Sequence, residues 1–247
     1  MKIVYLSETD DLVPYAMSAV MIDEKDWRKS YDTFKSFRKN IKNVTGLRTE
    51  DPFCIPSLAG KGDEPLLTGT KGRMVLAAFS QILSSLPITI AGVVSKSGGS
   101  LRSDLRKRAF PVLMQRIERA SDEGGGFRFV VVLNEDMDRD TRSLSRKLRV
   151  YNPLPGGANV PMTDLIEDSF VREQNTSHLL KSAELSAFMY RALYLFRSNH
   201  ASDSSMLSDY TNIDREFVFR IFYVWYEKGV LMEKASLSNK YGMVTIR

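Results

Sequence analysis

The chain has 247 residues, of which 43% are apolar, 10% aromatic and 26% charged, with a formal net charge of +5 at neutral pH. This composition is typical of a globular protein with a sizeable core, and it excludes disorder as the dominant state. No apolar run approaches the ~18 residues of a membrane span, and residues 1–10 lack the pattern of a secretory signal, so we expect a cytoplasmic protein without membrane contact.

The first half of the chain alternates strand and helix patterns. After Asp23, apolar residues at spacings of three, four and seven predict a helix that faces a core and ends at Gly46. Residues 48–72 are rich in proline and glycine and predict a long irregular loop, which an amphipathic helix follows from Arg73. The strand patterns of this half cover residues 2–6, 15–22 and 88–94.

The second half continues with helices and strands as far as a polar stretch at residues 198–203. A helix from Leu101 should kink or restart at Pro111. The later predicted elements are a strand at 127–133, a helix at 140–150, a short strand at 164–167 and a helix at 177–197. Because the polar stretch marks a possible boundary, we divide the chain into a main domain, residues 1–199, and a C-terminal appendage of helix and hairpin, residues 200–247.

The appendage has two interpretations. A short helix, a longer helix at 214–228 and two strands within 230–246 are compatible with a winged-helix unit, which would contact duplex DNA. Against this, the longer helix is aromatic on most of its circumference, which favours packing on the main domain or on a protein partner. The residues of the winged-helix interpretation are Arg215, Arg220, Lys234 and Lys240, and those of the partner interpretation are Phe217, Phe222, Trp225 and Tyr226.

Acidic residues follow two of the predicted strands. Glu8 and Asp10 come after the first strand, and Glu135 comes after the strand at 127–133. Strand ends far apart in sequence can meet in an α/β sheet, and a carboxylate from the helix at 177–197 could join them. Carboxylate clusters of this kind hold Mg²⁺ or Mn²⁺, and two such ions about 4 Å apart assist phosphodiester cleavage. The alternative is that these acids face solvent or cap the next helix.

These segments resemble the domain-of-unknown-function 3800 family, in order and spacing, over about 197 of the 247 residues. The family usually begins with a strand and Asp-Glu-Ser-Gly-Asp, where this chain has Ser7-Glu8-Thr9-Asp10 after Tyr5-Leu6. The matching segments are Ser57–Gly62, Val93–Lys96, Val131–Glu135, Glu167–Phe170, Ser177 and Lys181–Leu185. The resemblance implies an α/β, ribonuclease-H-like fold, a mixed sheet flanked by helices, with a metal-dependent nuclease centre at the acidic strand ends.

The departures from the family pattern predict a degenerate centre. Ser7 stands at the family's first acidic position, Asn134 stands at or beside the strand-end acid, and Lys181 stands where the family has glutamine. A serine hydroxyl supplies no charge for bridging two cations, and a lysine adds a cation where a metal should lie. If the centre is active, its catalytic and Mg²⁺- or Mn²⁺-binding residues are Glu8, Asp10, Glu135 and Glu184.

Three functions remain open from the sequence. The leading one is binding of nucleic acid or a nucleoprotein partner with nuclease activity weakened or lost, the second is an active nuclease with atypical ligands, and the third is a non-catalytic interaction subunit of a larger assembly that associates with a protein partner or itself. Binding would use phosphate contacts from two basic helices and would weaken steeply with salt. The predicted contacts are Arg102, Arg106, Lys107, Arg108, Arg142, Arg146 and Lys147.

Overall fold

The fold is an α/β layer structure built on one six-stranded mixed sheet. The computed structural model describes residues 1–9, 13–47, 54–61, 70–96, 101–123, 125–153, 158–173, 177–197, 206–232 and 241–246. The strands are β1 (Lys2–Glu8), β2 (Tyr15–Asp23), β3 (Ile88–Ser95), β4 (Phe129–Leu133), β5 (Phe170–Val171) and β6 (Met243–Ile246). The helices are α1 (Glu24–Thr45), α2 (Ile55–Leu58), α3 (Thr70–Ser85), α4 (Arg102–Glu123), the 3-10 turn η1 (Glu135–Met137), α5 (Asp138–Leu148), α6 (His178–Arg197) and α8 (Arg215–Glu227).

The sheet has the strand order β5-β4-β1-β2-β3-β6. Strands β1, β2 and β3 form an antiparallel meander, whereas β4 runs parallel to β1, β5 parallel to β4 and β6 parallel to β3. The α/β class with a mixed sheet between helices is therefore confirmed, and it is consistent with the ribonuclease-H-like fold. Among the described residues, no helix combines the length and the apolar character needed to cross a membrane.

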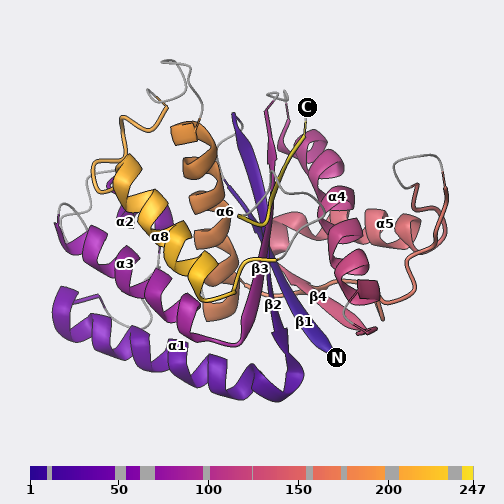
Figure 1. The fold of residues 1–247 in the computed structure, drawn as a ribbon, viewed down its shortest axis with the longest axis horizontal. Coiled ribbons are helices and arrows are strands. Elements are labelled where there is room, and N and C mark those ends of the chain that lie inside the picture. Colours follow the sequence, from indigo (N-terminus) through magenta and orange to yellow (C-terminus); the bar gives the residue numbers. More distant parts are fainter. Residues whose placement is uncertain are drawn as a thin grey trace.

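Two separate cores cover the two faces of the sheet. Helices α1, α2, α3, α6 and α8 pack on one face, and α4 and α5 pack on the other (Figure 1). Because side chains alternate along a strand, Val4 and Leu6 lie in the α4 core while Tyr5 lies in the α6 core. The same alternation directs Ser7 toward the α6 face and Glu8 toward the α4 face.

Helix α6 lies close to the sheet, because small side chains line its contact with the strands. Ser182, Ala183, Ser186 and Ala187 are all buried, and the Ser18 hydroxyl of β2 donates a hydrogen bond of 2.7 Å to the Ala183 carbonyl. Helix α1 ends at Gly46, whose φ of 79° is left-handed and whose N–H donates to the Lys42 carbonyl. The end predicted for this helix is therefore confirmed.

Two local predictions need correction. Helix α4 continues through Pro111 as one element from Arg102 to Glu123, so the helix does not restart there. The strand predicted at 164–167 is only an isolated bridge between Phe129 and Leu165, and the strand beside β4 is Phe170–Val171 instead. Most of the predicted loop at 48–72 lies outside the described residues.

The C-terminal segment is part of the sheet and of the main core, which corrects the prediction of an appendage. Leu231 pairs with Ile90, and β6 pairs with the next residues of β3, so both follow one edge of β3 in the same direction and do not form a hairpin with each other. Helix α8 packs against α3 and α6. The winged-helix interpretation is wrong for the same reason, and its Lys234 and Lys240 lie outside the described residues.

Candidate functional site: an ion-paired pocket at the strand ends

A pocket of about 300 Å³ lies where β1 and β4 end. These strands are parallel and adjacent, so their C-terminal ends reach the same edge of the sheet. The pocket is lined by Glu8, Thr9, Cys54, Ile55, Pro56, Lys61, Arg102, Asn134, Asp136, Glu184, Phe188 and Tyr210. We call it the strand-end pocket. The sequence prediction that distant segments converge is confirmed for Glu8, Asn134 and Glu184.

Two further predicted site residues are placed differently or cannot be placed. Glu135 is exposed on η1 and does not line the strand-end pocket, whereas its neighbour Asp136 does. The side chain of Asn134 caps η1 by accepting a hydrogen bond from the Met137 N–H at 3.2 Å, which starts the turn before residue 135. The prediction for Glu135 is therefore wrong, and Asp10 lies outside the described residues.

The Glu8 carboxylate is buried and bound by Arg106 of α4. The Arg106 Nη2 donates to Glu8 Oε1 at 2.6 Å, and Nε donates to Oε2 at 2.9 Å, which is a bidentate pair. The Tyr15 hydroxyl also donates to Oε2, at 2.5 Å. Both oxygens of Glu8 therefore already accept hydrogen bonds from the protein's own side chains.

The pKa values of the two donors agree with this arrangement. Burial by itself lowers the pKa of Arg106, but its hydrogen bonds to Glu8 and the charges of Glu8 and Asp140 outweigh burial and raise it. Burial, followed by the charge of Glu8 and its hydrogen bond, raises the pKa of Tyr15 well above its usual value. Arg106 thus stays charged and Tyr15 stays protonated, so both remain donors to Glu8 at neutral pH.

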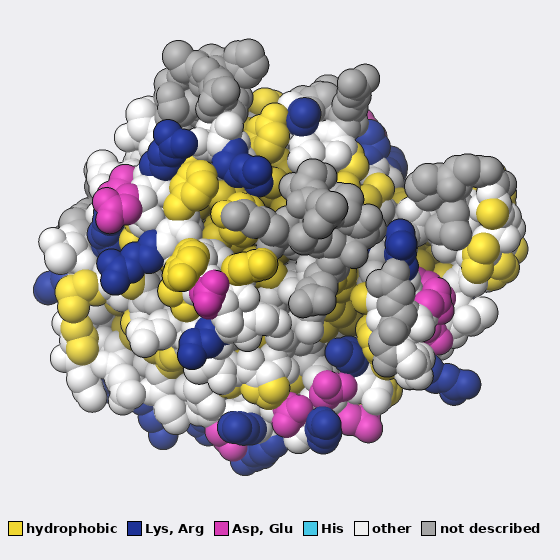
Figure 2. Space-filling view, in the orientation of Figure 1, with side chains coloured by type: hydrophobic (Ala, Val, Ile, Leu, Met, Phe, Trp, Pro, Cys, Tyr) yellow, Lys and Arg dark blue, Asp and Glu magenta, His cyan; other side chains and the backbone are white. Residues whose placement is uncertain are grey.

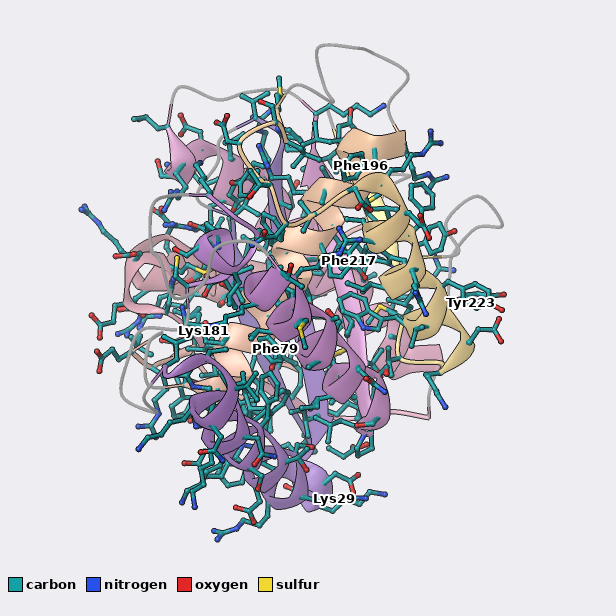
Figure 3. The ribbon with its side chains drawn as sticks, turned by 90° about the vertical axis from the view of Figure 1, so that its left-hand side faces the viewer. Lys29, Phe79, Lys181, Phe196, Phe217 and Tyr223 are labelled. Carbon is teal, nitrogen blue, oxygen red and sulfur yellow. The ribbon has the colours of Figure 1, made fainter. Side chains whose placement is uncertain are left out.

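A second carboxylate of the pocket has its own cation. Lys181 Nζ donates to Glu184 Oε2 at 2.7 Å, one turn apart on α6, and both side chains are almost fully buried. Figure 3 shows Lys181 towards the N-terminal end of α6, at the opposite end of the helix from Phe196. Lys181 therefore lies beside the helix acid, as the sequence predicts.

Ser7 is the third residue that makes the pocket unlike a metal site, after the paired Glu8 and Glu184. Its hydroxyl is buried, faces α6 and has no hydrogen-bond partner among the described residues. An acid at this position would extend toward the face of Glu184, but serine leaves that face without a second carboxylate. The donors around the pocket do not fit Mg²⁺ or Mn²⁺, because Glu8 and Glu184 are held by side-chain cations and Ser7 is uncharged, so Asp136 is the one lining carboxylate for which no ion pair is formed among the described residues. Among the described residues, no group of three or more acidic, histidine or cysteine side chains could hold a metal ion.

The basic helices also differ from their predicted role. Arg106 is only 5% exposed and is bound to Glu8 and Asp140, so the prediction that it contacts phosphate is wrong. Arg102 lies at the pocket, with its Nε 3.9 Å from Glu8 Oε1. Three others pair with acids on the surface, namely Lys107 with Asp104, Arg142 with Asp138 and Arg146 with Asp168. Arg108 and Lys147 are exposed.

The predicted partner-binding aromatic residues mostly belong to the core. Phe222 and Trp225 are fully buried, and the Trp225 Nε1 donates to the Ser80 carbonyl at 3.0 Å, so the prediction that they bind a partner is wrong. Phe217 is 8% exposed and its aromatic ring stacks under Arg73. Tyr226 is 49% exposed. Helix α8 therefore packs on the main domain, one of the two possibilities that its aromatic pattern indicates.

Sequence reasoning missed Tyr15 and Asp140 as members of the site. Arg106 and Glu8 are 98 residues apart, and no pattern in either segment predicts that the two side chains form an ion pair. The available signal was the spacing of Arg102 and Arg106, which puts two cations one helical turn apart on the same face. Comparison with protein-family models gave no match for the sequence, and comparison with curated proteins gave none.

Proposed function

We propose that this protein is a ribonuclease-H-like nucleic-acid-binding protein of domain-of-unknown-function 3800 ancestry, whose nuclease centre has become an ion-paired structural pocket. The observation that carries the proposal is the double neutralisation of the strand-end pocket. Arg106 binds both oxygens of Glu8, and Lys181 binds Glu184. These cations belong to the chain, so a metal ion would have to displace them to coordinate the two carboxylates.

The chemistry of phosphodiester cleavage supports the loss of activity. Metal-assisted cleavage needs carboxylates that are free to coordinate cations and so to stabilise the attacking and leaving oxygens. A fixed guanidinium on Glu8 and a fixed ammonium on Glu184 balance the charges of these two carboxylates and compete with a metal ion for their oxygens. The net charge of +5 supports binding of a polyanion, which would be salt-dependent and independent of sequence.

The test uses labelled single- and double-stranded DNA and RNA with Mg²⁺, Mn²⁺ or EDTA. We expect binding that weakens with salt and no metal-dependent cleavage. Cleavage that requires a metal and disappears in Glu184→Gln would instead establish the active nuclease. Because the glutamine of this variant keeps the size of the side chain and a hydrogen-bonding oxygen for Lys181, it is a better control than alanine.

A second candidate, an interaction subunit, is favoured by the outer face of α8. Tyr223 and Tyr226 are 62% and 49% exposed at a spacing of three residues. Hydrophobic side chains gather over α8 in Figure 2, and Figure 3 shows Tyr223 pointing away from the protein. If this face mediates association, Tyr223→Ala with Tyr226→Ala lowers the sedimentation coefficient or abolishes partner binding while the melting temperature stays near that of the wild type. Unchanged association of the double variant excludes this face.

A further inference from the structure

The net positive charge of the protein is concentrated on one helix that sequence reasoning did not select. Helix α1 has seven basic and three acidic residues, an excess of four, in a chain whose net charge is +5. Helices α4 and α5, from which phosphate contacts were predicted, have an excess of two each. Helix α1 follows the lower edge of the molecule in Figure 1, and Lys and Arg side chains line that edge in Figure 2.

The exposed lysines of α1 are unpaired. Among the described residues, none of them has a carboxylate within ion-pair distance, in contrast to Lys107, Arg142 and Arg146. Two of the acids of α1 are already used, because Asp32 binds Arg28 at 3.0 Å and Glu24 lies 3.8 Å from the N-terminal amine. The lysines are Lys25, Lys29, Lys35, Lys39 and Lys42, and we call them the α1 lysine row.

Helical geometry puts the α1 lysine row on one face. At 3.6 residues per turn the five side chains fall within an arc of about 140° and extend over about 26 Å. The opposite face carries Phe34, Phe37 and Ile41, which are buried in the core and fix the orientation of the helix. Figure 3 shows Lys29 on the outer side of α1. The row is therefore held rigidly toward solvent.

The neighbours of the lysines favour nucleic acid over a membrane as the partner. Ser36, Asn40 and Asn43 are exposed beside the row, and such side chains hydrogen-bond to phosphate oxygens. A helix that lies in a membrane surface inserts its apolar face into lipid, but the apolar face of α1 is occupied by the core. A strand of duplex nucleic acid offers a phosphate about every 3.4 Å along its axis, so several phosphates lie within the length of the row.

We propose that the α1 lysine row is the surface that binds the phosphate backbone of nucleic acid, rather than the arginines of α4 and α5. This inference rests on the proposed function, since it assigns the surface of that same binding. Lys107 of α4 and Arg142 and Arg146 of α5 would have to give up carboxylate partners to reach phosphate. The five lysines have no such partner among the described residues.

The experiment compares two variants that lose the same charge. Lys35→Gln/Lys39→Gln/Lys42→Gln removes three members of the row, and Lys107→Gln/Arg142→Gln/Lys147→Gln removes three charges from α4 and α5. Fluorescence anisotropy measures binding of DNA and RNA duplexes of about 20 base pairs over a series of salt concentrations, since they must cover the ~26 Å row. All six positions are on the surface, and circular-dichroism melting confirms that both variants are folded.

We expect the lysine-row variant to bind roughly tenfold to 100-fold more weakly near physiological salt, with a log–log salt slope smaller by about 3, because each phosphate contact contributes about 0.9 to that slope. The control variant should stay close to the wild type. Two outcomes overturn this surface but leave the proposed function in place. In one, the wild type binds and the lysine-row variant binds equally well; in the other, both variants lose the same affinity. A wild type that binds neither duplex overturns this surface, and one that also binds no single-stranded DNA or RNA overturns both. Row-dependent binding to phosphatidylserine vesicles without binding of any nucleic acid also overturns both, and it assigns the row to anionic membranes.

Discussion

Arg106 controls what Glu8 can bind, because its guanidinium joins three elements through buried charges. It binds Glu8 at the end of β1 and Asp140 at the start of α5, at distances of 2.6 to 2.9 Å. Removing one member of a buried pair leaves the other charge without compensation, which costs more than the pair contributes. The network therefore fixes α4 and α5 against the strand ends and also prevents Glu8 from acting as a metal ligand.

A double-mutant cycle tests this structural role. Glu8→Gln should lower the free energy of unfolding by about 3 kcal/mol, since Arg106 stays buried with Asp140 as its remaining partner. Glu8→Gln/Arg106→Met should lose less than the sum of the two single variants, because the unpaired guanidinium is then gone. Urea denaturation gives the four free energies. Additive effects would show that the two side chains do not depend on each other.

Ser7 and Lys181 are the two residues whose substitution by the residue types of the proposed family should give divalent-ion binding. In Ser7→Asp/Lys181→Gln, a carboxylate is added on the α6 face and Glu184 loses its cation. We expect this variant to melt below the wild type in EDTA and to gain several degrees with Mn²⁺, because bound ligand stabilises the folded state. Lys181→Gln alone is the control and should gain little. A double variant that does not respond to Mn²⁺ would contradict the assignment of Ser7 to the missing ligand position.

At the scale of elements, helix α6 depends on a glycine of β3. Tyr190 is fully buried, and its ring covers Gly92 so closely that an added Cβ would overlap the Cγ, Cδ2 and Cε2 atoms. Gly92→Ala should therefore destabilise the protein by about 1–3 kcal/mol through overpacking. Thermal unfolding measures the effect, and Gly92→Ala in a Tyr190→Leu background should show a smaller loss. An equal loss in both backgrounds would mean that the ring is not the obstacle.

The C-terminal elements can be tested by deletion. Residues 241–246 include β6, and the Arg116 guanidinium donates to the carbonyls of Gly92 and Gly242, joining this segment to β3 and α4. Because β6 completes the sheet and α8 completes the main core, deletion of residues 202–247 should give a protein that does not fold cooperatively. Circular-dichroism melting distinguishes this from a stable main domain, which is what a separate appendage would leave.

Sequence patterns predicted the elements far better than their assembly. Strand alternation, the helical spacing after Asp23 and Gly46 at the end of α1 depend on neighbouring residues, and they proved correct. The position of β6 depends on pairing with β3, about 150 residues earlier, and the aromatic residues of α8 carry no sign of whether a core or a partner covers them. Periodicity shows that a face is buried but does not identify what buries it.

The same limit applies to the strand-end pocket. Acidic residues at the ends of β1 and β4 could be placed together because parallel neighbours end at one edge. Asp136 lines the pocket in place of Glu135 because of the η1 turn, which the sequence pattern did not predict. Arg106 reaches Glu8 because of the way α4 crosses the sheet, and the sequence did not predict this either. A count of basic residues also does not show which of them form ion pairs. Arg142 and Arg146 of α5 do, and the α1 lysine row does not among the described residues, but this difference depends on where the acids lie in the structure.

At the scale of the whole molecule, the proposed function assigns nucleic-acid binding and the former nuclease centre to different places, whereas a nuclease needs binding and cleavage at one site. In the strand-end pocket, Glu8 and Glu184 are each paired with a side-chain cation. On the outer face of α1 lie five lysines that have no carboxylate partner among the described residues. Under the proposed function, the protein binds a polyanion and does not cleave it. In this account, wild-type binding should be no tighter in Mg²⁺ than in EDTA at equal ionic strength, as measured by fluorescence anisotropy, since no metal bridges protein and phosphate and Mg²⁺ only competes for the phosphates. Tighter binding in Mg²⁺ than in EDTA would contradict it.

Calorimetric titration of the wild-type protein with Mn²⁺ addresses the internal neutralisation of the pocket directly. With Arg106 and Lys181 on the carboxylates, we expect no saturable heat at millimolar Mn²⁺, while Ser7→Asp/Lys181→Gln under the same conditions gives a binding isotherm. A saturable isotherm for the wild type that disappears in Glu184→Gln would contradict the account, because it would show that a metal displaces the side-chain cations and that the centre is still functional.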